Sequence, residues 1–117
     1  MGIKRIQDTM SLNRIFLVGD ELTVKVYESR RPGVYGKQCV AIVEFGGEHY
    51  CGCLTGGCGY DKVSTAVDSA LHAAAHARGK KMENYWNGSG QNKEAIMDFL
   101  ALFSIVVGTV DIREVSA

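Results

Sequence analysis

The hydrophobic periodicity of the chain changes at the glycine-rich segment 56–62. Before this segment, apolar and polar residues alternate in stretches such as 22–26, and a spacing of two is typical of a strand with one buried face. After it, apolar residues recur at spacings of three and four, which is typical of an amphipathic helix: Val63, Ala66, Val67, Ala70, Leu71 and Ala74. A sheet with helices packed on it predicts an α+β domain.

Two hairpins are expected in the first half of the chain. Residues 15–18 and 22–27 form the first. The apolar run 38–45 and the segment 48–54, which returns antiparallel to it, form the second, around Gly46-Gly47. Two glycines supply the positive φ angles of a two-residue turn, and this turn sets the pairing of the second hairpin. The expected opposed pairs are Phe45 with Glu48, Val43 with Tyr50, Ile42 with Cys51 and Val40 with Cys53.

Two helices and a last strand complete the expected elements. Asp61 or Ser64 can cap the first helix, and Gly79 is typical of the position just after a helix end. Asn92 can cap the second helix, whose apolar stripe is Ile96, Phe99, Leu100 and Phe103. Residues 104–107 are compatible with helix or strand, and residues 109–113 alternate as a strand should.

Length and composition limit the chain to a single α+β domain over residues 1–117. With 46% hydrophobic and 22% charged residues, the chain resembles globular domains and not disordered ones. We expect an antiparallel sheet of about five strands, in the order strand-strand-strand-strand-helix-helix-strand, with two helices on one face.

Positive and negative charges balance, with 13 Lys and Arg against 13 Asp and Glu. This balance argues against binding of nucleic acid or anionic membrane over the whole surface. Residues 1–37 and 62–81 each carry three more basic than acidic residues, and the remaining segments show the reverse. A cationic surface near the first hairpin and the first helix is one consequence, and solvated charges spread over the surface are the alternative.

The N-terminal residues do not lead into an apolar run of the signal-peptide type, and no apolar stretch reaches the ~18 residues of a membrane span. We therefore expect a cytoplasmic protein without a membrane partner. In that compartment the four cysteines are expected as reduced thiols: Cys39, Cys51, Cys53 and Cys58.

The junction 54–62 is the main candidate for a binding site. A glycine-rich turn from a strand into a helix presents backbone N–H groups and the positive end of the helix dipole to an anion. The residues expected to contribute are Gly56, Gly57, Gly59, Tyr60 and Lys62. The segment departs from the phosphate-binding loop pattern because Lys62 follows Asp61 instead of glycine. A tight turn that needs several glycines explains the same residues.

The stretch Gly57-Cys58-Gly59-Tyr60-Asp61-Lys62-Val63-Ser64-Thr65-Ala66 resembles a Gly-x-Gly-Tyr-Asp-Lys-x-Ser-x-Ala signature of small phage and mobile-element proteins with no assigned activity. The resemblance implies an intracellular bacterial or phage setting and does not supply a reaction.

The order of three strands, a glycine turn and an alanine-rich helix led by Lys62 resembles the second half of a double-stranded-RNA-binding domain. That likeness implies lysines at the helix start that contact phosphates across a groove. Lys62 alone occupies that place here, and no amphipathic helix is expected before the strands.

Tyr85 and Trp86 lie in the segment 82–92, which is rich in Asn and Gly and has no periodicity. Aromatic residues in such a loop are typical of recognition surfaces, and they also pack over cores. We include both in the expected recognition surface.

Two sets of residues match the chemistry of metal ligands. Asp68, His72 and His76 lie four residues apart on the first helix, and Cys51, Cys53 and Cys58 follow His49 closely. An exposed polar helix face and ordinary core packing of cysteine explain the same two sets. Cys58 at a helix start also has the setting of a catalytic thiol, which requires a base. We expect no metal and no cofactor.

The sequence is best interpreted as a small binding module and not as an enzyme. The expected partner is a macromolecule or an anionic ligand, held at Gly56–Lys62 and contacted by Tyr85 and Trp86. A nucleic-acid-binding domain, a zinc-stabilised domain and a thiol-dependent enzyme are the alternatives. The apolar sheet edges and second helix leave self-association as a homo-oligomer open.

Overall fold

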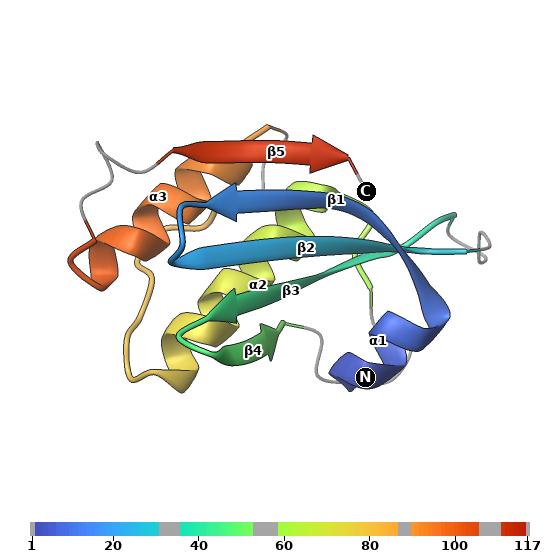
Figure 1. The fold of residues 1–117 in the computed structure, drawn as a ribbon, viewed down its shortest axis with the longest axis horizontal. Coiled ribbons are helices and arrows are strands. Elements are labelled where there is room, and N and C mark those ends of the chain that lie inside the picture. The colour runs from blue at the N-terminus through green and yellow to red at the C-terminus, as the bar shows by residue number, and fades with distance from the viewer. Residues whose placement is uncertain (1, 31–35, 53–58, 87–89, 106–110, 117) are drawn as a thin grey trace.

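The computed structural model describes residues 2–30, 36–52, 59–86, 90–105 and 111–116. Within these residues, an antiparallel five-stranded sheet has the strand order β4-β3-β2-β1-β5 (Figure 1). The elements in chain order are α1 (Ile3–Thr9), β1 (Met10–Val18), β2 (Leu22–Ser29), β3 (Cys39–Phe45), β4 (Glu48–Cys51), α2 (Val63–Ala77), α3 (Asn92–Leu102) and β5 (Ile112–Ser116). The expected α+β class is confirmed. None of the described helices has both the length and the apolar character needed to cross a bilayer.

The hairpin of β3 and β4 has the register that Gly46 and Gly47 predict. The opposed pairs are Phe45 with Glu48, Val43 with Tyr50 and Ile42 with Cys51. Both glycines have positive φ angles, 60° and 80°, as a two-residue turn of this kind requires. The fourth expected pair lies outside the described residues because it includes Cys53.

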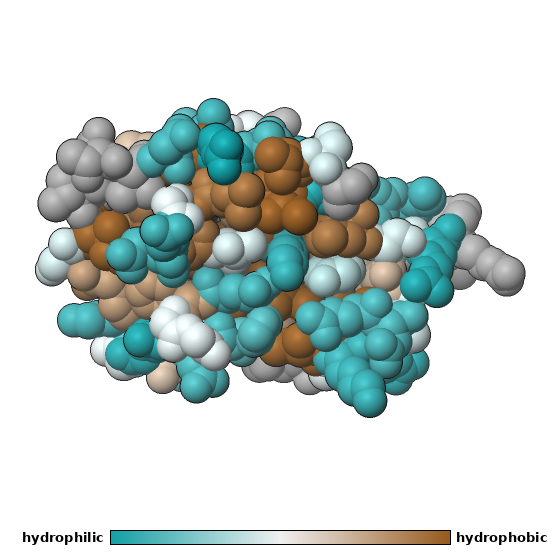
Figure 2. Space-filling view, viewed as in Figure 1, coloured by the Kyte–Doolittle hydropathy of each residue, from teal (hydrophilic) through white to brown (hydrophobic). Residues whose placement is uncertain are grey.

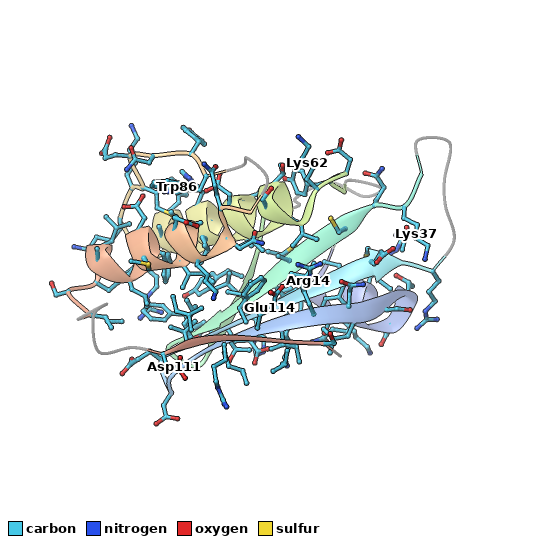
Figure 3. All side chains as sticks on the ribbon, turned by 90° about the horizontal axis from the view of Figure 1, so that it is seen from above. Arg14, Lys37, Lys62, Trp86, Asp111 and Glu114 are labelled. Atoms are coloured by element: carbon cyan, nitrogen blue, oxygen red, sulfur yellow. The ribbon has the colours of Figure 1, made fainter. Side chains whose placement is uncertain are left out.

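One helix was missing from the expected order: α1 precedes the strands and lies on the sheet face opposite α2 and α3 (Figure 3). The helix has seven residues and no side-chain cap, so local interactions stabilise it only weakly. Its stability comes from Ile6, which is fully buried in a second, smaller core with Met10, Tyr27, Val40 and Ile42. The expectation of no helix before the strands is therefore wrong, and β1 starts earlier than expected, at Met10.

The main core lies between the sheet, α3 and one face of α2. This face consists mostly of small side chains, and Ala66, Ala70 and Ala74 are almost fully buried. The helix backbone therefore comes close to the sheet, and it also comes close to Gly52, just after β4. A Cβ at Gly52 would overlap Ser69 Oγ and would lie 2.6 Å from the Ser69 carbonyl carbon. The inward residues of β2 in this core are the expected ones: Leu22, Val24 and Val26.

The helix starts are not capped as expected. Lys62 is the N-cap of α2 and Gln91 is the N-cap of α3, and neither side chain makes a capping hydrogen bond. The expected helix end after α2 is confirmed, because Gly79 follows it with a φ of 76°. Its N–H donates to the carbonyl of His76 at 3.0 Å, as in a typical glycine-terminated helix.

The end of α3 is closed by a residue with a left-handed backbone. Ser104 has a φ of 59°, and its N–H donates to the carbonyl of Ala101 at 3.2 Å. The N–H of Ile105 donates to the carbonyl of Leu100 at the same distance. Residues 104 and 105 thus form the closing turn of the helix, and residues 106–107 lie outside the described part of the chain.

The sheet face opposite α2 is only partly covered. Apolar surface is visible on this face over β1 and β5 (Figure 2). The strand pairing places Ile15, Lys25 and Val115 together on it. The open face is therefore a mixture of apolar and charged side chains, with no continuous apolar layer.

We expect Gly52→Ala to reduce the free energy of unfolding by about 1–3 kcal/mol, because the added methyl group has to displace the backbone of α2. Chemical denaturation measures this change. Gly2→Ala is the matched control, since no atom lies within 4 Å of its added Cβ. Equal stability of the two variants would show that α2 does not pack as closely as described.

We expect Ser104→Gly to increase the free energy of unfolding by about 0.5–1 kcal/mol, because glycine adopts a left-handed backbone without steric cost. Thermal and chemical denaturation measure the gain. Ser104→Ala keeps a Cβ at this position and should bring no gain. A loss of stability in the glycine variant would contradict the described helix end.

Candidate functional site

The described part of the glycine-rich junction is held by the protein itself. Gly56 and Gly57 lie outside the described residues. A Cβ at Gly59 would lie 2.7 Å from the Gln38 Cβ, so this glycine permits close packing. The N–H of Tyr60 donates to the carbonyl of Cys39 at 2.9 Å. The amide of Tyr60 is therefore engaged within the fold and is not a free donor for a ligand.

Lys62 and Arg14 line one hollow of about 440 Å³ at the starts of α2 and α3, which we call the cationic hollow. Arg14 comes from β1 and Lys62 from the start of α2 (Figure 3). The other described residues that line it are Val63, Ser64, Gly90 and Asn92. Sequence analysis identified Lys62 but not Arg14, although Arg14 belongs to the positively charged segment 1–37.

The charges around the cationic hollow favour an anion. A helix N-terminus carries a partial positive charge, and residues at the starts of both α2 and α3 line the hollow. The ammonium of Lys62 forms no ion pair with the described residues. Arg14 Nη1 donates to Glu114 Oε1 at 2.8 Å, which offsets part of its charge. Asp61, which would repel an anion, is not among the described lining residues.

The two aromatic residues of the 82–92 segment have different environments. Trp86 packs against the main core, and its indole Nε1 donates to Asp98 Oδ2 at 2.8 Å. Tyr85 is 74% exposed, and its ring stacks on the ring of His72 at a centroid distance of 4.6 Å. Trp86 therefore anchors the segment to α3, and Tyr85 presents an aromatic surface beside α2.

Asp68 and His72 form a polar pair on α2, in which Asp68 is buried and His72 is half-buried. Asp68 is 3% exposed, which contradicts the interpretation of Asp68, His72 and His76 as one exposed polar face. Burial raises the pKa of Asp68, and the backbone N–H of Trp86 and the charge of His72 partly oppose this. His72 Nε2 lies 3.4 Å from Asp68 Oδ1 and 3.0 Å from the carbonyl oxygen of Asn84. In the described part of the chain, no three His, Cys, Asp or Glu side chains are placed to hold a metal.

Cys39 does not have the properties of a catalytic thiol. Cys39 is buried, its Sγ donates to the carbonyl of Tyr60 at 3.1 Å, and burial raises its pKa to about 11. Cys51 is half-buried and lies opposite Ile42. Cys53 and Cys58, which belong to the expected zinc set and the expected thiol site, lie outside the described residues.

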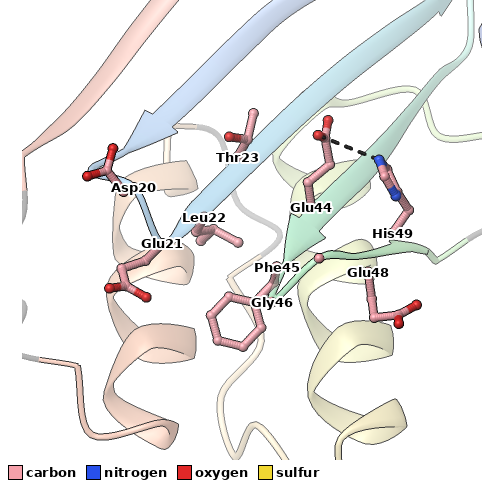
Figure 4. A pocket seen from close by; sticks show the side chains of 10 residues that line it. Asp20, Glu21, Leu22, Thr23, Glu44, Phe45, Gly46, Glu48 and His49 are labelled. Atoms are coloured by element: carbon pink, nitrogen blue, oxygen red, sulfur yellow. Dashed lines mark ion pairs between the residues drawn. The ribbon is translucent and has the colours of Figure 1, made fainter.

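A second hollow, of about 230 Å³, lies where the two hairpin turns meet (Figure 4). Four carboxylate side chains line it: Asp20, Glu21, Glu44 and Glu48. Glu44 also approaches Lys25 Nζ at 2.7 Å and His49 Nε2 at 3.6 Å, so part of this charge is paired. Sequence analysis missed this site, although antiparallel pairing brings both turns to the same end of the sheet.

No family model, curated protein or solved structure matches this chain.

We expect Asp68→Asn to change the pH dependence of stability. A carboxyl group whose pKa is higher in the folded state binds more protons there, so its contribution makes the protein less stable as pH rises from its ordinary pKa of 3.8 to the raised value. Asparagine removes this contribution. The stability of the variant relative to the native protein should therefore increase over that pH range in chemical denaturation. Parallel curves would contradict the raised pKa.

Proposed function

We propose that this protein is a binding module that holds an anionic group of its partner in the cationic hollow. The observation that carries the proposal is the meeting of Arg14 and Lys62, from distant parts of the sequence, in one hollow at the starts of two helices. A charged ligand gains most where cationic side chains and helix dipoles act together. Lys62 therefore remains part of the proposed anion site, as the sequence predicts. Arg14 takes the place of the backbone N–H of Tyr60 as the second group that binds the anion.

The proposed role is binding and not catalysis, in a cytoplasmic setting. The buried thiol of Cys39 is not part of a disulfide, which supports a reducing compartment. The cationic hollow presents Arg14 and Lys62, which complement a negatively charged group. The pKa of Cys39 is too high for this thiol to act as a nucleophile at neutral pH. Tyr85, at the surface beside α2, adds aromatic contact area for the same partner.

We expect Lys62→Gln to weaken the binding of pyrophosphate about tenfold, because it removes one charge-assisted contact. Isothermal titration calorimetry measures the affinity. Lys81→Gln, beyond the opposite end of α2, changes the net charge by the same amount and should leave the affinity unchanged. Glu114→Gln should strengthen binding, because it releases Arg14 from its ion pair.

The loss of pyrophosphate affinity caused by Lys62→Gln should become smaller with added salt, because the hollow is open to solvent and ions screen its charges. Equal weakening by Lys62→Gln and Lys81→Gln would show general attraction to a charged surface and not a site. An absence of pyrophosphate binding by the native protein would refute the proposed function.

A further inference from the structure

A third hollow, of about 270 Å³, lies beside α2 and combines Tyr85 with side chains that the proposed function does not use. Its described lining residues are Thr65, Asp68, Ser69, His72 and Tyr85, and we call it the tyrosine hollow. None of them is among the described lining residues of the cationic hollow. The hydroxyl of Tyr60 lies 2.8 Å from Ser69 Oγ and holds that side of the hollow in place.

The carboxylate of Asp68 is short of one hydrogen bond. The residue is 3% exposed, and Oδ1 accepts no hydrogen bond from the described part of the protein. His72 Nε2 is a candidate donor at 3.4 Å, but this nitrogen is closer to the carbonyl oxygen of Asn84, at 3.0 Å. A buried carboxylate oxygen without a donor destabilises a fold, and a ligand that supplies an N–H removes that cost.

The surroundings of Asp68 favour a cationic donor. The charge of His72 acts on the same carboxylate, and the negative charge of Asp98 on α3 opposes that effect. The ring of Tyr85 lies parallel to that of His72, with an angle of 10° between their planes, and most of Tyr85 is exposed. Its ring makes no hydrogen bond with the described residues, so it can turn to admit a flat group. Aromatic faces and carboxylates together are typical of sites for organic cations.

We propose that the tyrosine hollow receives an arginine side chain of a partner protein, with the guanidinium stacked on Tyr85 and donating to Asp68 Oδ1. A guanidinium is planar and stacks on aromatic rings, whereas an ammonium does not. It carries five N–H donors, and it is more weakly hydrated than an ammonium, so it loses less on entering a buried site. The tyrosine hollow shares no described lining residue with the cationic hollow. It would bind a cation, whereas the cationic hollow would bind an anion.

The test is a two-dimensional NMR titration of the native protein with N-acetyl-arginine-N-methylamide. We expect saturable shifts at Thr65, Ser69 and His72. The corresponding lysine compound should bind more weakly, and the uncharged citrulline compound should not bind. Asp68→Asn should raise the dissociation constant about tenfold, because the charge-assisted bond is lost.

Tyr85→Ala should also raise the dissociation constant, and this exposed residue can be changed without loss of the core. Met97→Ala is its control, because Met97 is 44% exposed and is not among the described lining residues of the tyrosine hollow. If Asp68→Asn does not fold, the Tyr85→Ala and citrulline titrations decide the question. Absent shifts, equal binding of the citrulline compound or no effect of Tyr85→Ala would each overturn the proposal. Tighter binding of free arginine than of the blocked compound would overturn the assignment to a partner protein.

Discussion

The close packing of α2 against β3 and β4 determines where the proposed binding sites lie. Alanines on the buried face of α2 and the absence of a side chain at Gly52 allow the helix to approach the sheet closely. This placement brings the start of the helix, with Lys62, to the same hollow that Arg14 of β1 lines. It also leaves the other side of α2 free to receive the segment that contains Tyr85 and Trp86. The two proposed sites therefore depend on one packing contact.

One helix thus presents two chemically different surfaces. Its start is electropositive, because the helix dipole and two cationic side chains act in the same direction there. Its side carries carboxylates, because Asp68 is buried six residues beyond Lys62 and the charge of Asp98 on α3 acts on it. A formal net charge of zero is consistent with this arrangement, because equal numbers of positive and negative charges can lie in different places on the surface. A partner that carries both signs could engage both surfaces.

Local sequence patterns predicted the elements whose structure is determined locally. The Gly46-Gly47 turn predicts the register of β3 with β4, and the spacing of apolar residues predicts α2. The structure confirms the register and the helix. The short helix α1 was missed because its stability comes from the burial of Ile6 against distant strands. The burial of Asp68 was missed for the same reason, since the N–H that bonds to it comes from Trp86 in a separate segment. Neither contact leaves a periodic signal in the sequence.

The most direct test of this account is to locate a bound anion by backbone amide chemical shifts. On addition of pyrophosphate, the account predicts that the largest changes occur at Lys62, Val63, Gly90 and Asn92, which come from two segments that meet only at the cationic hollow. Changes concentrated at Lys80 and Lys81, beyond the opposite end of α2, would contradict it.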